Sequence, residues 1–200
     1  MAGTIIAISR QFGSGGREIG LAVAHQLGIP CYDKELIALA AKHGELDQTR
    51  LADFDEKKES PWLYSVLYEG NDNVAKGEPV SAVLFKLQSE IIRTIAQTEN
   101  AVIIGRCADH ILRDSGAKLL TVFIAAPFDE RVKRKMELEQ LDQKHTEALV
   151  RKTDKQRRLY YQSNTNWRWG DASHFDLYFD SCTNSKDEIV NQIVNSYSKL

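Results

Sequence analysis

The stretch from Gly13 to Glu18 carries the residue types from which a protein can build a phosphate-binding site. Glycines and a serine follow a short β-branched run at 4–9 and precede an amphipathic run at 19–27. A glycine loop between a strand and a helix lets backbone N–H groups converge on an anion, and the helix N-terminus adds partial positive charge. We therefore expect nucleotide or phosphate binding by these residues: Arg10, Gly13, Ser14, Gly15, Gly16, Arg17 and Glu18.

This loop departs from the complete phosphate-loop pattern, G-x-x-x-x-G-K-[ST]. Gly16 stands at the lysine position, Arg17 follows it at the position of the magnesium-binding hydroxyl, and the carboxylate of Glu18 comes one residue later. Arg17 and Arg10 are the nearest candidates for a substitute cation. By itself the loop is equally typical of a tight glycine turn in an ordinary α/β protein, so both interpretations stay open.

The composition is that of a near-neutral globular protein of one domain. The 200 residues include 42% hydrophobic residues, and 26 basic against 28 acidic residues give a net charge of -2. This balance gives no reason to expect nucleic-acid or membrane binding. The cysteines, Cys31, Cys107 and Cys182, are widely spaced, and the five histidines form no metal-ligand pattern. We expect no protein-held metal, free thiols and a cytoplasmic protein.

Unbroken apolar runs predict strands that are covered on both faces. Such runs occur at 4–9, 29–33, 101–105, 119–125 and 175–180, and helical patterns lie between them, including one at about 186–197. We therefore predict an α/β fold with a doubly wound, five-stranded parallel sheet.

Two further stretches are predicted to be helical insertions within a single domain that spans 1–200. The first covers 34–77, and the second covers about 128–170. The second is locally basic, although a charge run of this kind is usually only the solvated face of a helix.

The motifs occur in an order that resembles the cytidylate kinase-like family of P-loop nucleoside monophosphate kinases. This resemblance covers most of the chain. It is carried by the residues at 8–17, 32–35, 104–109 and 123–127, by Arg131 and Arg134, and by the residues at 154–157, 160–161 and 176–178.

The resemblance implies a P-loop kinase that uses ATP with Mg²⁺ to phosphorylate CMP or another small acceptor. Arginine suits this chemistry, because phosphoryl transfer needs positive charge around the phosphate oxygens and the exclusion of water. By resemblance, the catalytic residues are Arg17, Arg106, Arg151 and Arg157; the acceptor is bound by Asp33 and Arg106; and the lid holds Arg131, Arg134, Asp154 and Arg158.

Simpler roles compete with several of these assignments. Asp33 could cap a helix that begins at Lys34, Arg106 could form a structural salt bridge, and the lid arginines could face solvent. The missing lysine also leaves open a second function. In this alternative the chain is a catalytically weakened nucleotide- or phosphate-binding module that acts as a sensor or binds a partner.

Overall fold

The computed structural model describes residues 3–33 and 80–200, and its centre is a five-stranded, all-parallel sheet. The strands lie in the order β2-β3-β1-β4-β5, which confirms the predicted α/β class. They are β1 (Thr4–Arg10), β2 (Cys31–Tyr32), β3 (Ala101–Ile104), β4 (Lys118–Ala125) and β5 (Leu177–Asp180).

The strand β1 lies at the middle of the sheet and pairs with two neighbours. Its residues Ile5 to Ile8 pair with β3, and Thr4 to Arg10 pair with β4. All of its residues from Ile5 to Ser9 are buried. A strand covered on both faces needs an unbroken apolar run, which is why the sequence pattern identified it.

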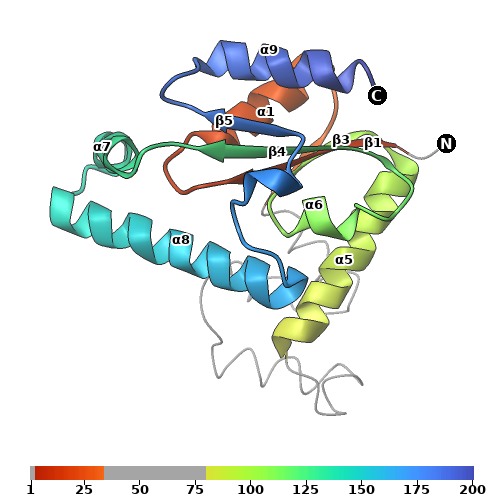
Figure 1. Ribbon diagram of the computed structural model, residues 1–200, viewed down its shortest axis with the longest axis horizontal. Coiled ribbons are helices and arrows are strands. Elements are labelled where there is room, and N and C mark those ends of the chain that lie inside the picture. The colour runs from red at the N-terminus through yellow and green to blue at the C-terminus, as the bar shows by residue number, and fades with distance from the viewer. Residues whose placement is uncertain (1–2, 34–79) are drawn as a thin grey trace.

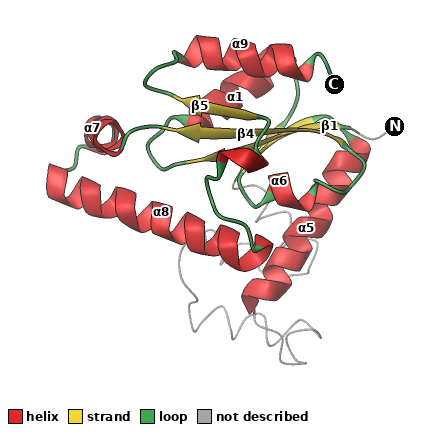
Figure 2. Ribbon diagram, viewed as in Figure 1, coloured by secondary structure: helices red, strands yellow, loops and turns green. Residues whose placement is uncertain are grey.

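Helices cover both faces of the sheet (Figures 1 and 2). On one face lie α1 (Gly16–Leu27) and α9 (Lys186–Tyr197), and on the other lie α5 (Val80–Thr98), α6 (Ala108–Ile111) and α8 (Gln143–Thr165). The helix α7 (Phe128–Glu139) follows β4 at the carboxyl edge of the sheet, and η3 (Ala172–His174) precedes β5. The predicted helix at 186–197 is confirmed by α9.

Two strands are shorter than the sequence predicts, and each has a local cause. The strand β2 begins after Pro30, which has no N–H to donate but whose carbonyl accepts a bond from Val102. Before β5, the side chain of Asp176 accepts from the backbone N–H of Thr121 at 2.8 Å, while the Asp176 N–H donates to the Thr121 hydroxyl at 2.9 Å. Side-chain bonds thus replace the ladder there.

The predicted basic insertion is a pair of helices, α7 and α8, joined at 140–142. The predicted acceptor insertion at 34–77 lies outside the described residues. No helix within 3–33 or 80–200 is long and apolar enough to cross a membrane.

The start of α9 provides a test of the local fold. Ser185 caps this helix in a reciprocal pair with Glu188, whose carboxylate accepts from the Ser185 N–H at 2.8 Å. We expect Ser185→Ala to lower the free energy of unfolding by about 1 kcal/mol. Ser198→Ala, which removes an exposed hydroxyl at the other end of α9, is expected to change it by less than about 0.5 kcal/mol. Chemical denaturation measures both, and equal effects would contradict the capping role.

Candidate functional site

The glycine loop lies where the carboxyl end of β1 meets the start of α1. Gly13 and Gly15 have φ values of 84° and 79°, which L side chains rarely adopt. A Cβ at Gly13 would also lie 2.9 Å from the Arg131 carbonyl oxygen. Within the described residues, the backbone N–H groups of Gly15 and Gly16 donate to no protein acceptor. The loop therefore presents backbone donors at a helix N-terminus, which is the arrangement that binds phosphate.

A buried arginine and a partly buried aspartate hold the residue that precedes Gly13; we call Arg131 and Asp154 the loop clamp. Asp154 accepts a bond from the Phe12 N–H at 2.8 Å, and Arg131 donates to the Phe12 carbonyl at 3.0 Å. The two side chains also pair with each other at 2.5 Å. Arg131 further donates to the Ala126 carbonyl. The loop clamp thus bonds both the N–H and the carbonyl of Phe12, the residue directly before Gly13.

At the end of β2, the buried carboxylate of Asp33 receives two arginines. The Nε of Arg17 lies 2.8 Å from one of its oxygens, and an Nη of Arg10 lies 3.4 Å from the other. Asp33 thus lies beside the glycine loop, as its predicted acceptor role requires. The competing helix-cap role concerns Lys34, which lies outside the described residues.

Three consecutive residues after β3 adopt positive φ values: Gly105 at 75°, Arg106 at 59° and Cys107 at 56°. Such conformations cost free energy in non-glycine residues and cluster at functional sites. Arg106 is partly buried here, and its charge counteracts the effect of burial on the pKa of Tyr160, which is raised. The turn therefore places a cation at the carboxyl end of a buried strand, the edge at which doubly wound sheets bind ligands.

Cations from α7 and α8 gather above the loop. Arg134 pairs with Glu18 at 2.7 Å, and its guanidinium would lie 3.3 Å from a Cβ at Gly15. Arg157 donates to the Arg10 carbonyl at 3.2 Å. The Nζ of Lys135 lies 4.7 Å from the ring centroid of Phe12. These cations surround the position where a bound phosphate chain would lie.

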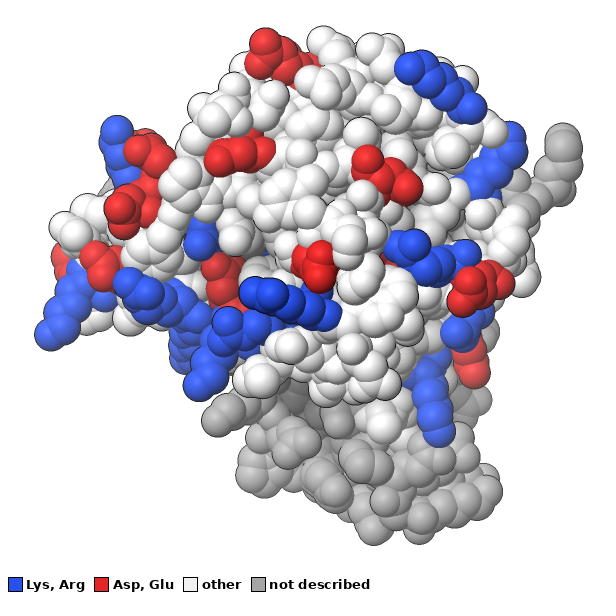
Figure 3. Space-filling view, viewed as in Figure 1, with Lys and Arg blue, Asp and Glu red and all other residues white. Residues whose placement is uncertain are grey.

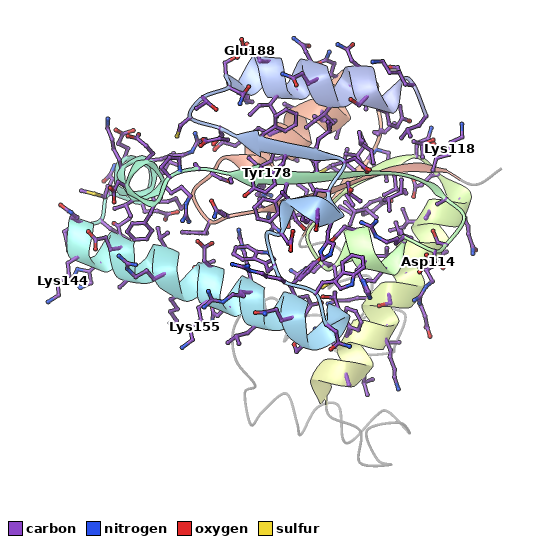
Figure 4. The ribbon with its side chains drawn as sticks, viewed as in Figure 1. Asp114, Lys118, Lys144, Lys155, Tyr178 and Glu188 are labelled. Atoms are coloured by element: carbon purple, nitrogen blue, oxygen red, sulfur yellow. The ribbon has the colours of Figure 1, made fainter. Side chains whose placement is uncertain are left out.

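Two of the predicted arginines lie elsewhere on the helix pair. The guanidinium of Arg151 lies 4.1 Å from the ring centroid of Phe128, and Arg158 is exposed on α8. Blue side chains follow α8 in Figure 3, and Lys144 and Lys155 extend away from the protein body in Figure 4. The basic run at 143–165 is therefore partly a solvated helix face and partly a set of site residues.

Two residues at the loop were not predicted from the sequence as site residues. Gln11 accepts a bond from the Ala126 N–H through its side-chain oxygen at 2.9 Å. The Ser181 hydroxyl donates to the Ser14 carbonyl at 2.8 Å, so the loop after β5 is tied to the glycine loop. Ser181 directly follows a strand at the carboxyl edge, and this position is the signal that could have identified it.

A buried acid lies behind Arg106. Asp109 is 1% exposed, and it accepts a bond from the Tyr161 hydroxyl at 2.6 Å. Its other oxygen has no partner among the described residues. Burial raises the pKa of Asp109, and Tyr161 partly opposes this effect. Cys107 is buried too, and burial raises the pKa of its thiol, so it packs as an inert thiol.

Comparison with known proteins fits this geometry. A model of the cytidylate kinase-like family matches residues 5–183. The chain belongs to that family. This confirms the resemblance seen in the sequence. Among curated proteins, no sequence matches the chain.

Solved structures extend the comparison to the whole fold. An uncharacterised protein from Eubacterium ventriosum is 27% identical, with a TM-score of 0.72 over 98% of this chain and 99% of that one. A shikimate kinase from Bacteroides thetaiotaomicron is 15% identical, with a TM-score of 0.50 over 98% and 99%. A shikimate kinase from Acinetobacter baumannii in complex with shikimate is 12% identical, with a TM-score of 0.51 over 98% and 94%. At such identities the kinases show a shared fold, which for this chain is that of the P-loop kinases.

The loop clamp can be tested by its effect on stability. We expect Asp154→Asn to lower the free energy of unfolding by about 3 kcal/mol, because it leaves the buried charge of Arg131 without its counter-ion. Glu139→Gln is the matched control, since it removes the same kind of charge from the more exposed Lys135–Glu139 pair and should cost less than about 1 kcal/mol. Chemical denaturation measures both variants, and similar losses would show that the clamp has no special role.

The raised pKa of Asp109 predicts a specific pH dependence. A folded-state pKa above the unfolded value means that the folded protein binds the proton more tightly, so stability falls as pH rises from about 4 through the raised pKa. Asp109→Asn removes this titration, so its stability relative to the wild type should increase between pH 4 and pH 7. Asp114→Asn, at an exposed position of the same segment, should show no such trend. Urea denaturation at several pH values decides this, and parallel curves for Asp109→Asn and the wild type would refute it.

Proposed function

We propose that this protein transfers the γ-phosphate of ATP to a small acceptor that itself carries a phosphate, such as CMP. The observation that carries this proposal is the meeting of two features at one edge of the sheet. Uncommitted backbone donors of the glycine loop lie on one side, and the Arg10–Asp33–Arg17 cluster lies on the other. Family membership supports the broader class of kinase-like phosphotransferase.

Each group has a role that its position supports. The loop N–H groups bind the donor phosphates, and Arg134 and Arg157 lie above them as the side chains that close over the transferring group. Arg106 binds the acceptor phosphate from the turn after β3. Catalysis then rests on positioning and charge stabilisation, and no covalent intermediate with the protein is needed.

Glu18 is the residue that fits Mg²⁺ at this site. Magnesium in kinases is bound by substrate phosphates, water and one or two carboxylates rather than by a full cage of protein ligands. Glu18 supplies one carboxylate at the start of α1, and the described residues contain no cluster of three acidic, histidine or cysteine ligands. A bound Mg²⁺ would neutralise phosphate charge, while Arg134 would be released from Glu18.

The second candidate function is a binding module that has lost catalysis. The observation in its favour is Gly16, since loss of the phosphate-loop lysine removes a contact worth a few kcal/mol of transition-state stabilisation. A coupled assay of ADP release with CMP, UMP, AMP, GMP and shikimate separates the two functions. Release of ADP that depends on a monophosphate supports the kinase. Thermal stabilisation by ATP without turnover supports the module, and a ligand at 100 times its Kd should stabilise by about 2.7 kcal/mol.

We place this function in the cytoplasm. Within the described residues Cys107 and Cys182 are free thiols, and the proposed substrates are nucleotides.

Arg106 offers a direct test of acceptor binding. We expect Arg106→Gln to weaken binding of the monophosphate by about ten-fold to a hundred-fold, because it removes a charge-assisted contact to phosphate. Glutamine carries the same backbone strain as arginine at this position, so any loss of stability reports the contacts of the side chain itself. Arg168→Gln, at an exposed site, is the control and should change neither quantity. Calorimetric titration and denaturation measure the two effects. Unchanged acceptor binding together with a large loss of stability would make Arg106 a structural residue.

A further inference from the structure

We infer that Arg10 supplies the positive charge that lysine supplies at position 16 of the complete phosphate-loop pattern. In this chain arginine stands at position 10, where the pattern has glycine, and glycine stands at position 16, where the pattern has lysine. The inference rests on the proposed function, and it adds the residue that neutralises the phosphates of the donor.

Alignment of the loop with the pattern G-x-x-x-x-G-K-[ST] shows the exchange. When Gly15 takes the second glycine position, the first glycine position falls on Arg10 and the lysine position on Gly16. The chain thus has a cation where the pattern has glycine, and glycine where the pattern has a cation.

Packing explains why the two changes occur together. Gly16 begins α1 and is not among the glycines with positive φ, so its backbone conformation is open to any residue. A Cβ at this position would lie 2.6 Å from the Cβ of Arg10 and 3.1 Å from its Cγ. Real Cβ atoms essentially never approach so closely. With arginine at position 10, position 16 can therefore carry no side chain without a shift of the backbone.

The Arg10 side chain then extends from the glycine loop to the turn after β3, at Gly105. Its Nη1 lies 2.1 Å from the place that a Cβ at Gly105 would occupy, so this glycine makes room for the guanidinium. Only 14% of the side chain is exposed. A cation in such an enclosed site attracts phosphate more strongly than one in water. Arg10 thus lies between the donor loop and the turn that carries Arg106.

Arg17 is less suited to this role than Arg10. Its side chain is 56% exposed, and its Nε lies 2.8 Å from Asp33. Arg10 lies further from the same carboxylate, at 3.4 Å. Arg10 is therefore the more enclosed of the two cations, and its distance to the Asp33 carboxylate is the longer one.

Restoring the standard pattern provides the test. The variants are Arg10→Gly, Gly16→Lys and the double variant, and calorimetry measures their affinity for tripolyphosphate and for ATP. We expect Arg10→Gly to bind at least about ten-fold more weakly, because a charge-assisted contact is lost. Gly16→Lys alone should also bind more weakly, because its side chain collides with Arg10. The double variant should recover to within about three-fold of the wild type, because removal of the Arg10 side chain leaves the Cβ of Ile124, at 3.2 Å, as the closest remaining neighbour of the new Cβ, a contact that a small shift relieves.

Two controls separate charge from packing. Arg10→Met keeps an unbranched stem without the charge, so it should lose affinity as Arg10→Gly does. The double variant Arg10→Gly, Asn195→Lys adds a lysine at an exposed position of the helix α9. It should not recover affinity. Denaturation confirms that each variant is folded, and Arg10→Met carries the test if Arg10→Gly does not fold.

The outcomes distinguish this inference from the proposed function. Wild-type affinity in Arg10→Gly and Arg10→Met, or a double variant no better than Arg10→Gly, overturns the exchange even if the protein proves to be a kinase. If the tripolyphosphate affinities of the wild type and the variants follow the expected order, but the wild type releases no ADP with any acceptor, the role of Arg10 is supported. The proposed kinase activity is then overturned.

Discussion

The side chain of Arg10 fills the space between the glycine loop and the turn after β3, and the surrounding residues are fitted to it. Among the glycines that the structure describes, Gly16 and Gly105 are those whose added Cβ atoms would collide with it. Asp33 contacts both Arg10 and Arg17, so a buried carboxylate partly balances the cations. Under the proposed function, a phosphate that enters the site would replace the Asp33 carboxylate as the anionic partner of these arginines. The site is therefore assembled around charge before any ligand binds, which lowers the cost of organising it later.

The cations at the carboxyl edge of the sheet fall into two groups that differ in burial and in their partners. Arg131 is 6% exposed, and its bonds go to Asp154 and to backbone carbonyls, so it supports the loop from behind. Arg134 is paired at the surface with Glu18, and surface pairs are weak enough to exchange partners. The basic residues of α7 and α8 therefore include side chains that hold the loop in place and side chains that lie at the surface, where a ligand could reach them.

The sequence predicted the fold well, because its information is local. Each buried strand is an unbroken apolar run, and the glycine loop marks the boundary between β1 and α1. The site was harder to predict, since its key contacts join distant segments. Nothing near Arg131 indicates that it holds the Phe12 carbonyl, and only the alignment of Arg10 with Gly16 reveals their shared space. Strand ends were overestimated where Pro30 and Asp176 interrupt the ladder.

The long reach of the loop clamp has a consequence for how the protein matures. Phe12 is bonded to residues that follow it by 119 and 142 positions, and Ser14 accepts a bond from a residue 167 positions later. The glycine loop leaves the ribosome early, but the groups that shape it are among the last to be synthesised. Ordering of the glycine loop therefore awaits almost the entire chain, and a nascent or truncated polypeptide that stops before α8 lacks groups that order this loop.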